Sequence, residues 1–377
     1  MPPGAKKLGL IVNPVAGLGG RVGLKGSDGL HVQRKALALG AVPHAQDRAV
    51  DALGRLPQLE GLEIVTWAGR MGEDAARACG FSPAVAGATE SDDSTADDTR
   101  AAAAELRKLG VDLLLFAGGD GTARDICEAV GEDVPALGIP AGVKIHSAVY
   151  ATNALNAGEL AGLFLSGRVW SLRAAEVMDI DEEAVRQGHI SAHLYGYLRV
   201  PVRTSLVQSL KAASGPGEGA EMEAIAAAVT ESMKPNILYL IGPGTTTRAI
   251  LDRMDLEKTL IGVDAVKDDK LVASDLNEDQ ILALIDDHEV EGVRVIVTPV
   301  GGQGCIFGRG NQQLSPAVLT RLGRENIIVL STQEKLNALG ARPLWVDTGD
   351  RDVDAKLAGH MRVITGYKYE AVCRVSG

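Results

Sequence analysis

An almost wholly apolar run, Val111–Ala117, that leads directly into a glycine-rich turn constrains the fold of this chain more than any other feature. A strand that is apolar on both faces needs cover on both faces, as strands inside parallel sheets have. The turn Gly118–Thr122 is followed by a helical pattern to about Val130 and by a short strand, Ala136–Ile139. Strand, helix and strand in this order predict βαβ units and a doubly wound parallel sheet.

Residues 1–166 are predicted to form this first domain, a nucleotide-binding α/β domain. Leu8–Val12 and Leu62–Trp67 are two further strands expected in its sheet. Ser94–Asp98 has the hydroxyl and carboxylate spacing of a capping box, and it precedes an alanine-rich helix. Ser147–Leu165 has helical spacing as well, and we expect a helix there.

Residues 167–350 are predicted to form a second, β-rich α+β domain that binds substrate. Val169–Ile180 and His193–Pro201 look extended and are expected in a second sheet. Leu260–Val266 and Lys270–Ala273, joined by Asp268-Asp269, are typical of a hairpin. Residues 351–377 are expected to form a C-terminal segment, with a return to the first domain as one option.

Charge and composition exclude several classes of function. The chain has 49 acidic and 38 basic side chains, a formal net charge of -11 and 3% aromatic residues. It therefore lacks the cationic field and the stacking surfaces of a general nucleic-acid binder. No apolar run approaches the roughly 18 residues that span a bilayer, and no secretory signal is apparent. The four cysteines are far apart in the sequence, which favours reduced thiols in a cytoplasmic protein. From the charge and the apolar runs, we expect neither membrane nor nucleic-acid partners.

The turn Gly118-Gly119-Asp120-Gly121-Thr122 carries the strongest chemical signal. Its glycines allow backbone N–H groups to approach a phosphate, and the following helix directs its positive end to the same point. Asp120 follows a buried strand, where open α/β sheets bind their ligands. Bare phosphate would repel this carboxylate, so we expect it to act as a general base or to contact a metal ion through water. The alternative is a plain strand-to-helix turn in which Asp-Gly satisfies the backbone.

Two more glycine-bearing loops follow strands of the same predicted sheet. Asn13-Pro14 precedes a loop with Gly17, and Gly138–Lys144 contains Gly142. Because parallel strands end at one edge of a sheet, we expect both loops beside Asp120, around a nucleotide. Arg124 and Lys144 are candidate counter-charges for phosphate, although such side chains are often simply solvated.

The second domain contains two further candidate binding loops. Gly242–Thr247 stands between a strand and a helix and repeats the phosphate-cradle pattern, with a plain helix cap at Thr245 or Thr246 as the alternative. Gly301–Gln313 holds five glycines between Gly301 and Gly310, too many for a helix or strand interior. Side chains in this stretch can bind phosphate or recognise the edge of a base or nicotinamide; they are Arg309, Asn311, Gln312 and Gln313. The alternative is a flexible surface loop.

The histidines and the acidic run predict no metal site held by the protein. His146, His189 and His193 fit no helical or hairpin metal spacing. Asp92-Asp93 and Asp97-Asp98 are most simply the start of a helix, with a Mg²⁺ role for Asp98 as the alternative.

Together these motifs resemble a known family. Leu113–Thr122 resembles the signature shared by NAD kinases, diacylglycerol-type lipid kinases and, more distantly, phosphofructokinases, and Asn13-Pro14 is similar to the opening motif of the first two groups. The resemblance is closest to the AcoX-like branch of the ATP-NAD kinases. It extends from Leu8 to about Pro316 and rests on three stretches in particular: Gly138–Ser147, Thr298–Gly304 and Phe307–Gln313.

The resemblance implies a Rossmann-like first domain and phosphorylation of NAD at the 2′-hydroxyl of its adenosine ribose, with ATP or polyphosphate as donor, Mg²⁺ as cofactor and a homo-oligomeric protein. Asp120 would handle the hydroxyl. The residues expected to bind the nucleotide phosphates are Asn13, Gly17, Gly118, Gly119, Gly121, Thr122, Arg124, Gly142 and Lys144. Those expected to bind substrate are Asn153, Gly244, Thr245, Thr246, Gly301, Gly302, Gln303, Arg309, Asn311 and Gln312.

The chain departs from both family patterns, which leaves the acceptor open. The Asn-Glu pair of ordinary NAD kinases has no clear counterpart, and Asn153 is the nearest candidate. Val143 and His146 stand where lipid kinases have threonine and aspartate. The alternatives are a kinase of another hydroxyl acceptor, such as a lipid or small polyol, and a nucleotide sensor without catalysis. Asp120 disfavours the sensor, because binding alone gains nothing from an anion beside phosphates.

Overall fold

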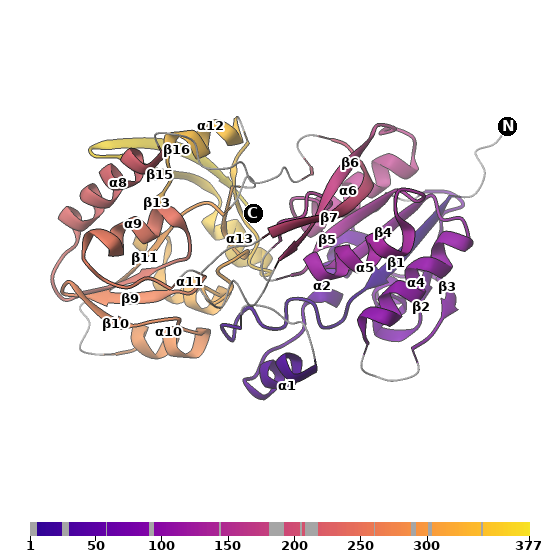
Figure 1. The fold of residues 1–377 in the computed structure, drawn as a ribbon, viewed down its shortest axis with the longest axis horizontal. Coiled ribbons are helices and arrows are strands. Elements are labelled where there is room, and N and C mark those ends of the chain that lie inside the picture. The colour runs from indigo at the N-terminus through magenta and orange to yellow at the C-terminus, as the bar shows by residue number, and fades with distance from the viewer. Residues whose placement is uncertain are drawn as a thin grey trace. The chain divides into compact units, whose positions relative to one another are not determined.

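The computed structural model describes residues 6–24, 30–57, 59–89, 94–142, 145–180, 192–203, 206–207, 218–259, 261–287, 292–300, 304–340 and 342–377 (Figure 1). The chain forms two compact units, and each is discontinuous in sequence. The first unit comprises Met1–Leu18 and Gly26–Leu210, and the second comprises Gly19–Lys25 and Lys211–Gly377.

The first unit is built on a five-stranded parallel sheet in the order β3-β2-β1-β4-β5. Every residue of β4 is buried, as its apolar sequence requires. The doubly wound sheet is therefore confirmed. The edge strand β3 was not predicted, because it is short and its residues are only partly buried or exposed. The strands are β1 (Lys7–Val12), β2 (Glu63–Trp67), β3 (Ala84–Gly87), β4 (Leu113–Gly118) and β5 (Ala136–Pro140).

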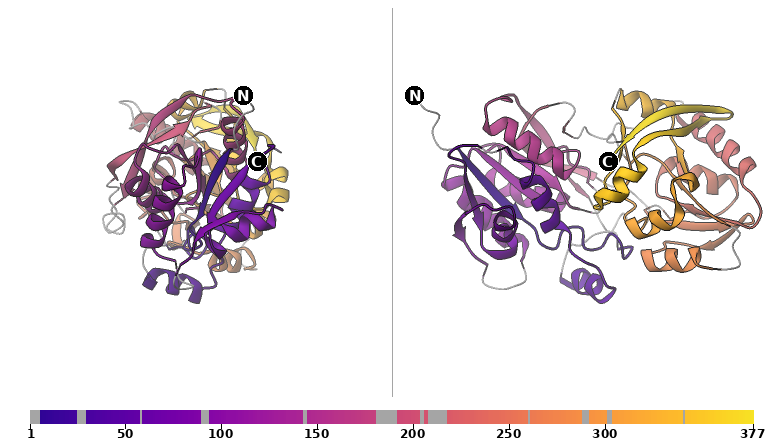
Figure 2. Two further views of the ribbon diagram at one scale, coloured as in Figure 1. Left: turned by 90° about the vertical axis from the view of Figure 1, so that its right-hand side faces the viewer. Right: turned by 180° about the vertical axis from the view of Figure 1, so that it is seen from behind.

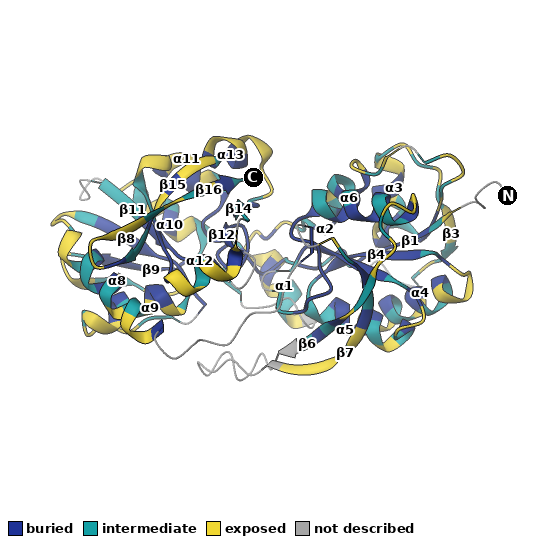
Figure 3. Cartoon of the chain, turned by 90° about the horizontal axis from the view of Figure 1, so that it is seen from above, coloured by how far each residue is buried: buried dark blue, intermediate teal, exposed yellow. Residues whose placement is uncertain are grey.

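Helices cover both faces of this sheet, with α2, α3 and α6 on one side and α4 and α5 on the other (Figure 3). The predicted capping box is present, because the Thr95 side chain accepts the Asp98 N–H while the Asp98 carboxylate accepts the Thr95 N–H. The last helix starts later than predicted, at Ala154, because the Asn153 side chain caps it. The helices are α1 (Leu30–Ala38), α2 (Ala45–Leu53), η1 (Gly69–Met71), α3 (Glu73–Ala78), α4 (Ala96–Lys108), α5 (Asp120–Val130) and α6 (Ala154–Leu165).

The two segments predicted as extended form an antiparallel ribbon, β6 (Leu172–Ile180) and β7 (Ala192–Pro201). This ribbon belongs to the first unit, because it packs on α5 and β5. The division of the chain therefore lies at Leu210 and not at the predicted residue 166.

The second unit is strand-rich, as predicted, and contains a nine-stranded sheet in the order β10-β9-β8-β11-β13-β15-β16-β14-β12. Strands β8, β11, β13 and β15 run parallel, while β9 and β10 form the predicted hairpin. The strands are β8 (Ile237–Ile241), β9 (Asp264–Lys267), β10 (Lys270–Ala273), β11 (Gly292–Val297), β12 (Cys305–Phe307), β13 (Ile327–Leu330), β14 (Leu344–Val346), β15 (Gly359–Gly366) and β16 (Tyr369–Ser376).

The C-terminal residues complete this sheet and do not return to the first unit. Strands β15 and β16 form a long antiparallel hairpin (Figure 2), and β15 pairs with β13. Residues 351–377 thus lie in the second unit, which corrects the option of a return. The helices of this unit are α8 (Glu218–Ser232), α9 (Thr245–Arg253), α10 (Glu278–Ile285), α11 (Pro316–Leu322), η3 (Arg324–Asn326), α12 (Gln333–Leu339) and α13 (Arg351–Leu357).

Each unit has its own apolar core. Alternate residues of β8 face two separate clusters in the second unit, with Leu238 and Leu240 in one and Tyr239 and Ile241 in the other. Within the described ranges, no helix has both the length and the hydropathy needed to cross a membrane.

Candidate functional site

The three glycine-bearing loops of the first unit meet at the carboxyl edge of its sheet. The Asn13 amide donates a hydrogen bond to the Thr122 hydroxyl (Nδ2 to Oγ1, 2.9 Å). A Cβ on Gly17 would lie 2.1 Å from the Ala141 carbonyl oxygen, and a Cβ on Gly142 would lie 2.7 Å from the Gly119 Cα. The glycines are therefore needed for close approach of the loop backbones, and the loops lie together as the parallel sheet predicts.

The N-terminus of α5 points its first amides into this edge. Gly119 is the N-cap and supplies no side-chain cap. A Cβ on the preceding Gly118 would lie 2.4 Å from the Thr122 Cβ, so only glycine fits there. The first-turn N–H groups of a helix need acceptors from outside the helix, and an anion can provide them.

A cavity of about 190 Å³ opens beside these amides. It lies at the N-termini of two helices, α4 and α5, whose dipoles both favour negative charge. Arg124 adds a guanidinium that is about one-third exposed, 3.9 Å from an Asp125 oxygen. The lining residues are Asn13, Val15, Gln33, Ser94, Thr95, Ala96, Gly121, Thr122, Arg124 and Asp125.

The Asp120 carboxylate links α5 to the loop after β5. Oδ1 accepts the Ser147 N–H at 3.0 Å, and Oδ2 accepts the His146 N–H at 2.8 Å. The His146 ring nitrogen Nδ1 lies 3.3 Å from Oδ2. The side chain of Asp120 is 10% exposed, so it is oriented by three contacts while one part of it stays accessible.

Three residues near Asp120 were not predicted as part of the site. His146 and Ser147 hold its carboxylate, and the Tyr150 hydroxyl donates to the Gly119 carbonyl oxygen at 2.5 Å. The only signal in the sequence was their position just after the third glycine loop. Asn153, predicted to bind substrate, caps α6 by accepting the Asn156 N–H at 2.8 Å, and Lys144 lies outside the described residues.

In the second unit, the Gly242–Thr247 loop forms an uncapped helix N-terminus. Gly244 is the N-cap of α9, with φ of 133°, so neither threonine caps the helix as the alternative proposed. Thr245 is exposed, whereas Thr246 is buried and accepts a hydrogen bond from the Lys335 ammonium at 2.8 Å.

The described part of the Gly301–Gln313 stretch is packed and not a loose surface loop. Asn311 is 1% exposed, and its amide is used internally, accepting the Gly308 N–H at 3.2 Å and donating to the Ile306 carbonyl at 2.8 Å. Arg309 is also buried, with Nε 3.9 Å from an Asp347 oxygen. Gln312 lies against Gly20, while Gly301, Gly302 and Gln303 lie outside the described residues.

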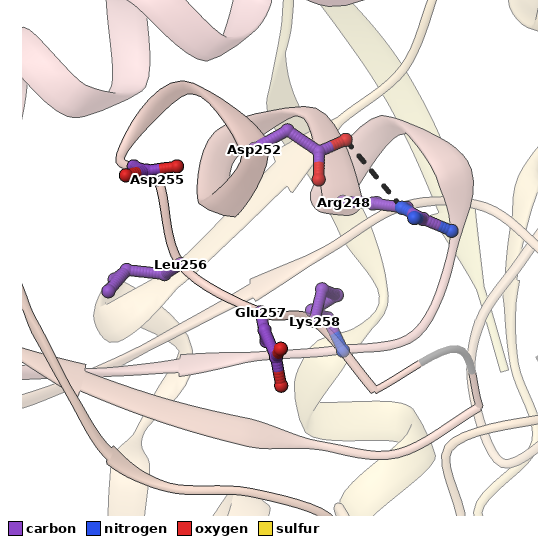
Figure 4. A pocket seen from close by; sticks show the side chains of 6 residues that line it. All are labelled: Arg248, Asp252, Asp255, Leu256, Glu257 and Lys258. Atoms are coloured by element: carbon purple, nitrogen blue, oxygen red, sulfur yellow. Dashed lines mark ion pairs between the residues drawn. The ribbon is translucent and has the colours of Figure 1, made fainter.

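A larger pocket of about 480 Å³ in the second unit contains none of the predicted site residues (Figure 4). Its charges are mixed, and Arg248 and Asp252 form an ion pair at 3.6 Å. The Lys258 ammonium is buried, 2.8 Å from an Asp264 oxygen, and burial lowers the pKa of Lys258 against the opposing effect of that carboxylate. The lining residues are Arg248, Asp252, Asp255, Leu256, Glu257 and Lys258.

The described residues form no group of three or more histidine, cysteine, aspartate or glutamate side chains that could hold a metal ion. A nucleotide-bound Mg²⁺ keeps several water molecules and takes most other ligands from phosphate, so it needs no such group.

Two family models match the chain. Residues 8–169 match the ATP-NAD kinase N-terminal domain, and residues 235–375 match the ATP-NAD kinase C-terminal domain. No curated protein matches the sequence.

Solved structures from Bacillus anthracis str. Sterne are similar to part of the chain. A putative diacylglycerol kinase is 18% identical with a TM-score of 0.24, and the match covers 47% of this chain and 43% of that one. A second diacylglycerol kinase is 17% identical with a TM-score of 0.23, and the match covers 48% of each chain. The chain thus spans less than half the length of either structure.

Proposed function

Because the chain belongs to the ATP-NAD kinase family, we propose that it transfers a phosphoryl group from ATP or polyphosphate to the 2′-hydroxyl of the adenosine ribose of NAD, giving NADP. The observation that carries this proposal is the meeting of three glycine-bearing loops around Asp120 and the α5 N-terminus. The AcoX-like branch, the cytoplasmic location and the homo-oligomer remain predictions.

The donor phosphates bind, in this proposal, at the N-terminus of α5. The first-turn amides, the α4 dipole and Arg124 neutralise their charge within the cavity of about 190 Å³. Phosphoryl transfer has a loose transition state with little covalent chemistry for the protein to perform. Positioning and charge neutralisation therefore supply most of the acceleration.

Asp120 orients the acceptor hydroxyl and takes its proton late in the transfer. A carboxylate has about four acceptor positions. The backbone N–H groups of His146 and Ser147 occupy two of them, one on each oxygen, and thereby orient the carboxylate. Such a general base typically contributes about 10²–10⁴ in rate.

Mg²⁺ would bind together with the donor phosphates and neutralise part of their charge. The described residues offer no cage for it, and both Asp120 oxygens already accept amide hydrogen bonds.

The test incubates the purified full chain with Mg-ATP, or polyphosphate, and NAD and detects the product by mass. NADP supports the proposal. If ADP forms only when a lipid or polyol is present, that acceptor and not NAD is the substrate. If the protein retains NAD or ATP unchanged, it is a nucleotide sensor.

Asp120→Asn tests the role of the carboxylate. We expect turnover to fall by about 10²–10⁴ while binding of ADP is largely kept. The substitution replaces a carboxylate oxygen that accepts a backbone N–H by an NH₂ group, which cannot accept it. We therefore also expect the free energy of unfolding to fall by about 1–3 kcal/mol, as measured by urea unfolding. Asp47→Asn, at an exposed carboxylate on α2, is the matched control. Retained turnover, or loss of ADP binding by a folded variant, would contradict the assignment.

A further inference from the structure

The second unit also has parallel neighbouring strands whose carboxyl ends lead into loops. Strands β8 and β11 are parallel neighbours, and Ile241 pairs with Ile296 near their carboxyl ends. The loop that opens α9 follows β8, and Thr298 follows β11. Ligands of open α/β sheets bind at such edges.

The N-terminus of α9 lacks a side-chain cap. Gly244 occupies the N-cap position, and the Thr247 hydroxyl turns back to the Gly242 and Gly244 carbonyl oxygens at 2.7 and 2.9 Å. The amides of the first turn are thus left to another acceptor.

Thr298 gives a second, independent indication of a ligand. Its side chain is buried, with the residue 3% exposed, and its hydroxyl has no hydrogen-bond partner in the described part of the chain. The Thr298 methyl group packs against the helix N-cap, because a Cβ on Gly244 would be 2.5 Å from Cγ2, and this contact places Thr298 beside the first turn of α9. A buried hydroxyl without a partner destabilises the fold, and a bound acceptor would remove that penalty.

Lys335 brings a cation to the same helix turn. Its ammonium donates to the Thr246 hydroxyl at 2.8 Å and lies 3.7 Å from a Glu218 oxygen. The Lys335 side chain is 25% exposed, so it is accessible from solvent. Glu218 offsets part of the lysine charge, and the positive end of α9 adds to what remains.

We propose that the first turn of α9, the Thr298 hydroxyl and the Lys335 ammonium bind a phosphoryl group, carried by a nucleotide or by free pyrophosphate. All three elements belong to the second unit. The inference goes beyond the proposed phosphoryl transfer, because it holds whether or not Asp120 acts on an acceptor.

The test measures protection of Lys335 from acylation. The full chain is treated with an N-hydroxysuccinimide ester with increasing pyrophosphate, ADP or NAD, at matched ionic strength, and modification of each lysine is quantified by peptide mass spectrometry. At ten times the dissociation constant, labelling of Lys335 should fall about tenfold. Lys6, an exposed lysine of the first unit, should be unaffected. Protection by ADP or NAD but not pyrophosphate would identify a nucleotide as the source of the phosphoryl group.

Thr298→Val removes the hydroxyl and keeps the shape of the side chain. The concentration that protects Lys335 should rise at least about tenfold, because hydrogen bonds to charged groups contribute about 1.5–3 kcal/mol. In the Thr298→Ser variant, the ligand should protect Lys335 as it does in the wild type. The valine variant should unfold at the same urea concentration as the wild type or at a higher one. Absence of protection in the wild-type protein, or equal protection in the valine variant, would overturn the proposal.

Discussion

Cys305 shows how strongly burial controls the chemistry of a single side chain in this protein. Its thiol is 3% exposed and lies 2.9 Å from the Phe307 carbonyl oxygen. Burial raises the pKa of Cys305 from its ordinary 9.0 to about 12, against a lowering effect of Arg309. The raised pKa keeps the thiol neutral from pH 7 to pH 10, and only about 10⁻⁴ of it is thiolate at pH 8.

We therefore predict that iodoacetamide alkylates Cys305 only after unfolding. Cys373, which is partly buried, should react in the folded protein, and peptide mass spectrometry separates the two. Equal labelling of Cys305 and Cys373 at pH 8 would contradict this.

At the residue scale, the sequence predicts positions that only one residue type can fill. Gly17, Gly118 and Gly142 were predicted from the motifs, and the structure shows that a Cβ at each would overlap a neighbour. The contacts of Asp120 with His146, and of Lys335 with Thr246, depend on how separate loops come together. No local pattern encodes such contacts, so the sequence did not predict them.

The β9–β10 hairpin depends on the backbone conformation of its two turn residues. Asp268 and Asp269 both have positive φ, 51° and 58°, as a two-residue turn between twisted strands requires. The Asp268 carboxylate also accepts the Asn236 N–H at 2.8 Å, whereas the Asp269 carboxylate makes no corresponding contact with the described residues.

We predict that Asp269→Gly stabilises the protein by about 0.5–1 kcal/mol, because glycine adopts positive φ without a Cβ clash. Asp268→Gly is the matched control, since it relieves the same strain but loses the contact with Asn236, and it should gain less or destabilise. Urea unfolding of the two variants and the wild type measures both effects. A destabilised Asp269→Gly variant would show that the turn conformation is not limiting.

At the element scale, strong local signals predicted most of the helices and strands. The buried strand β4 and the capping box of α4 were predicted because apolar runs and caps are local. The edge strand β3 was missed because a strand of four partly exposed residues has no such signal. The parallel pairing within the second unit was also not predicted, because it joins segments far apart in the sequence.

Over the whole molecule, the chain enters the second unit twice. Gly19–Lys25, directly after the first glycine loop, belongs to it, and the Arg21 carbonyl oxygen accepts the Glu278 N–H at 3.1 Å. A Cβ on Gly20 would lie 1.4 Å from the Gln312 side-chain oxygen. A division drawn from sequence at one boundary cannot represent this arrangement, which depends on long-range packing.

The separation of the apolar cores predicts two unfolding transitions. The described core residues fall into clusters that each lie within one unit, so each unit can lose its core alone. Leu114→Ala and Leu240→Ala are matched substitutions at fully buried leucines of the first and second units. Each should cost its own unit about 2–5 kcal/mol and leave the other unit nearly unchanged. Hydrogen exchange read by mass spectrometry on β4 and β8 peptides through a urea titration separates the two units. If either substitution shifted both sets of peptides equally, the units would unfold as one, and the cores would be coupled through contacts outside these clusters.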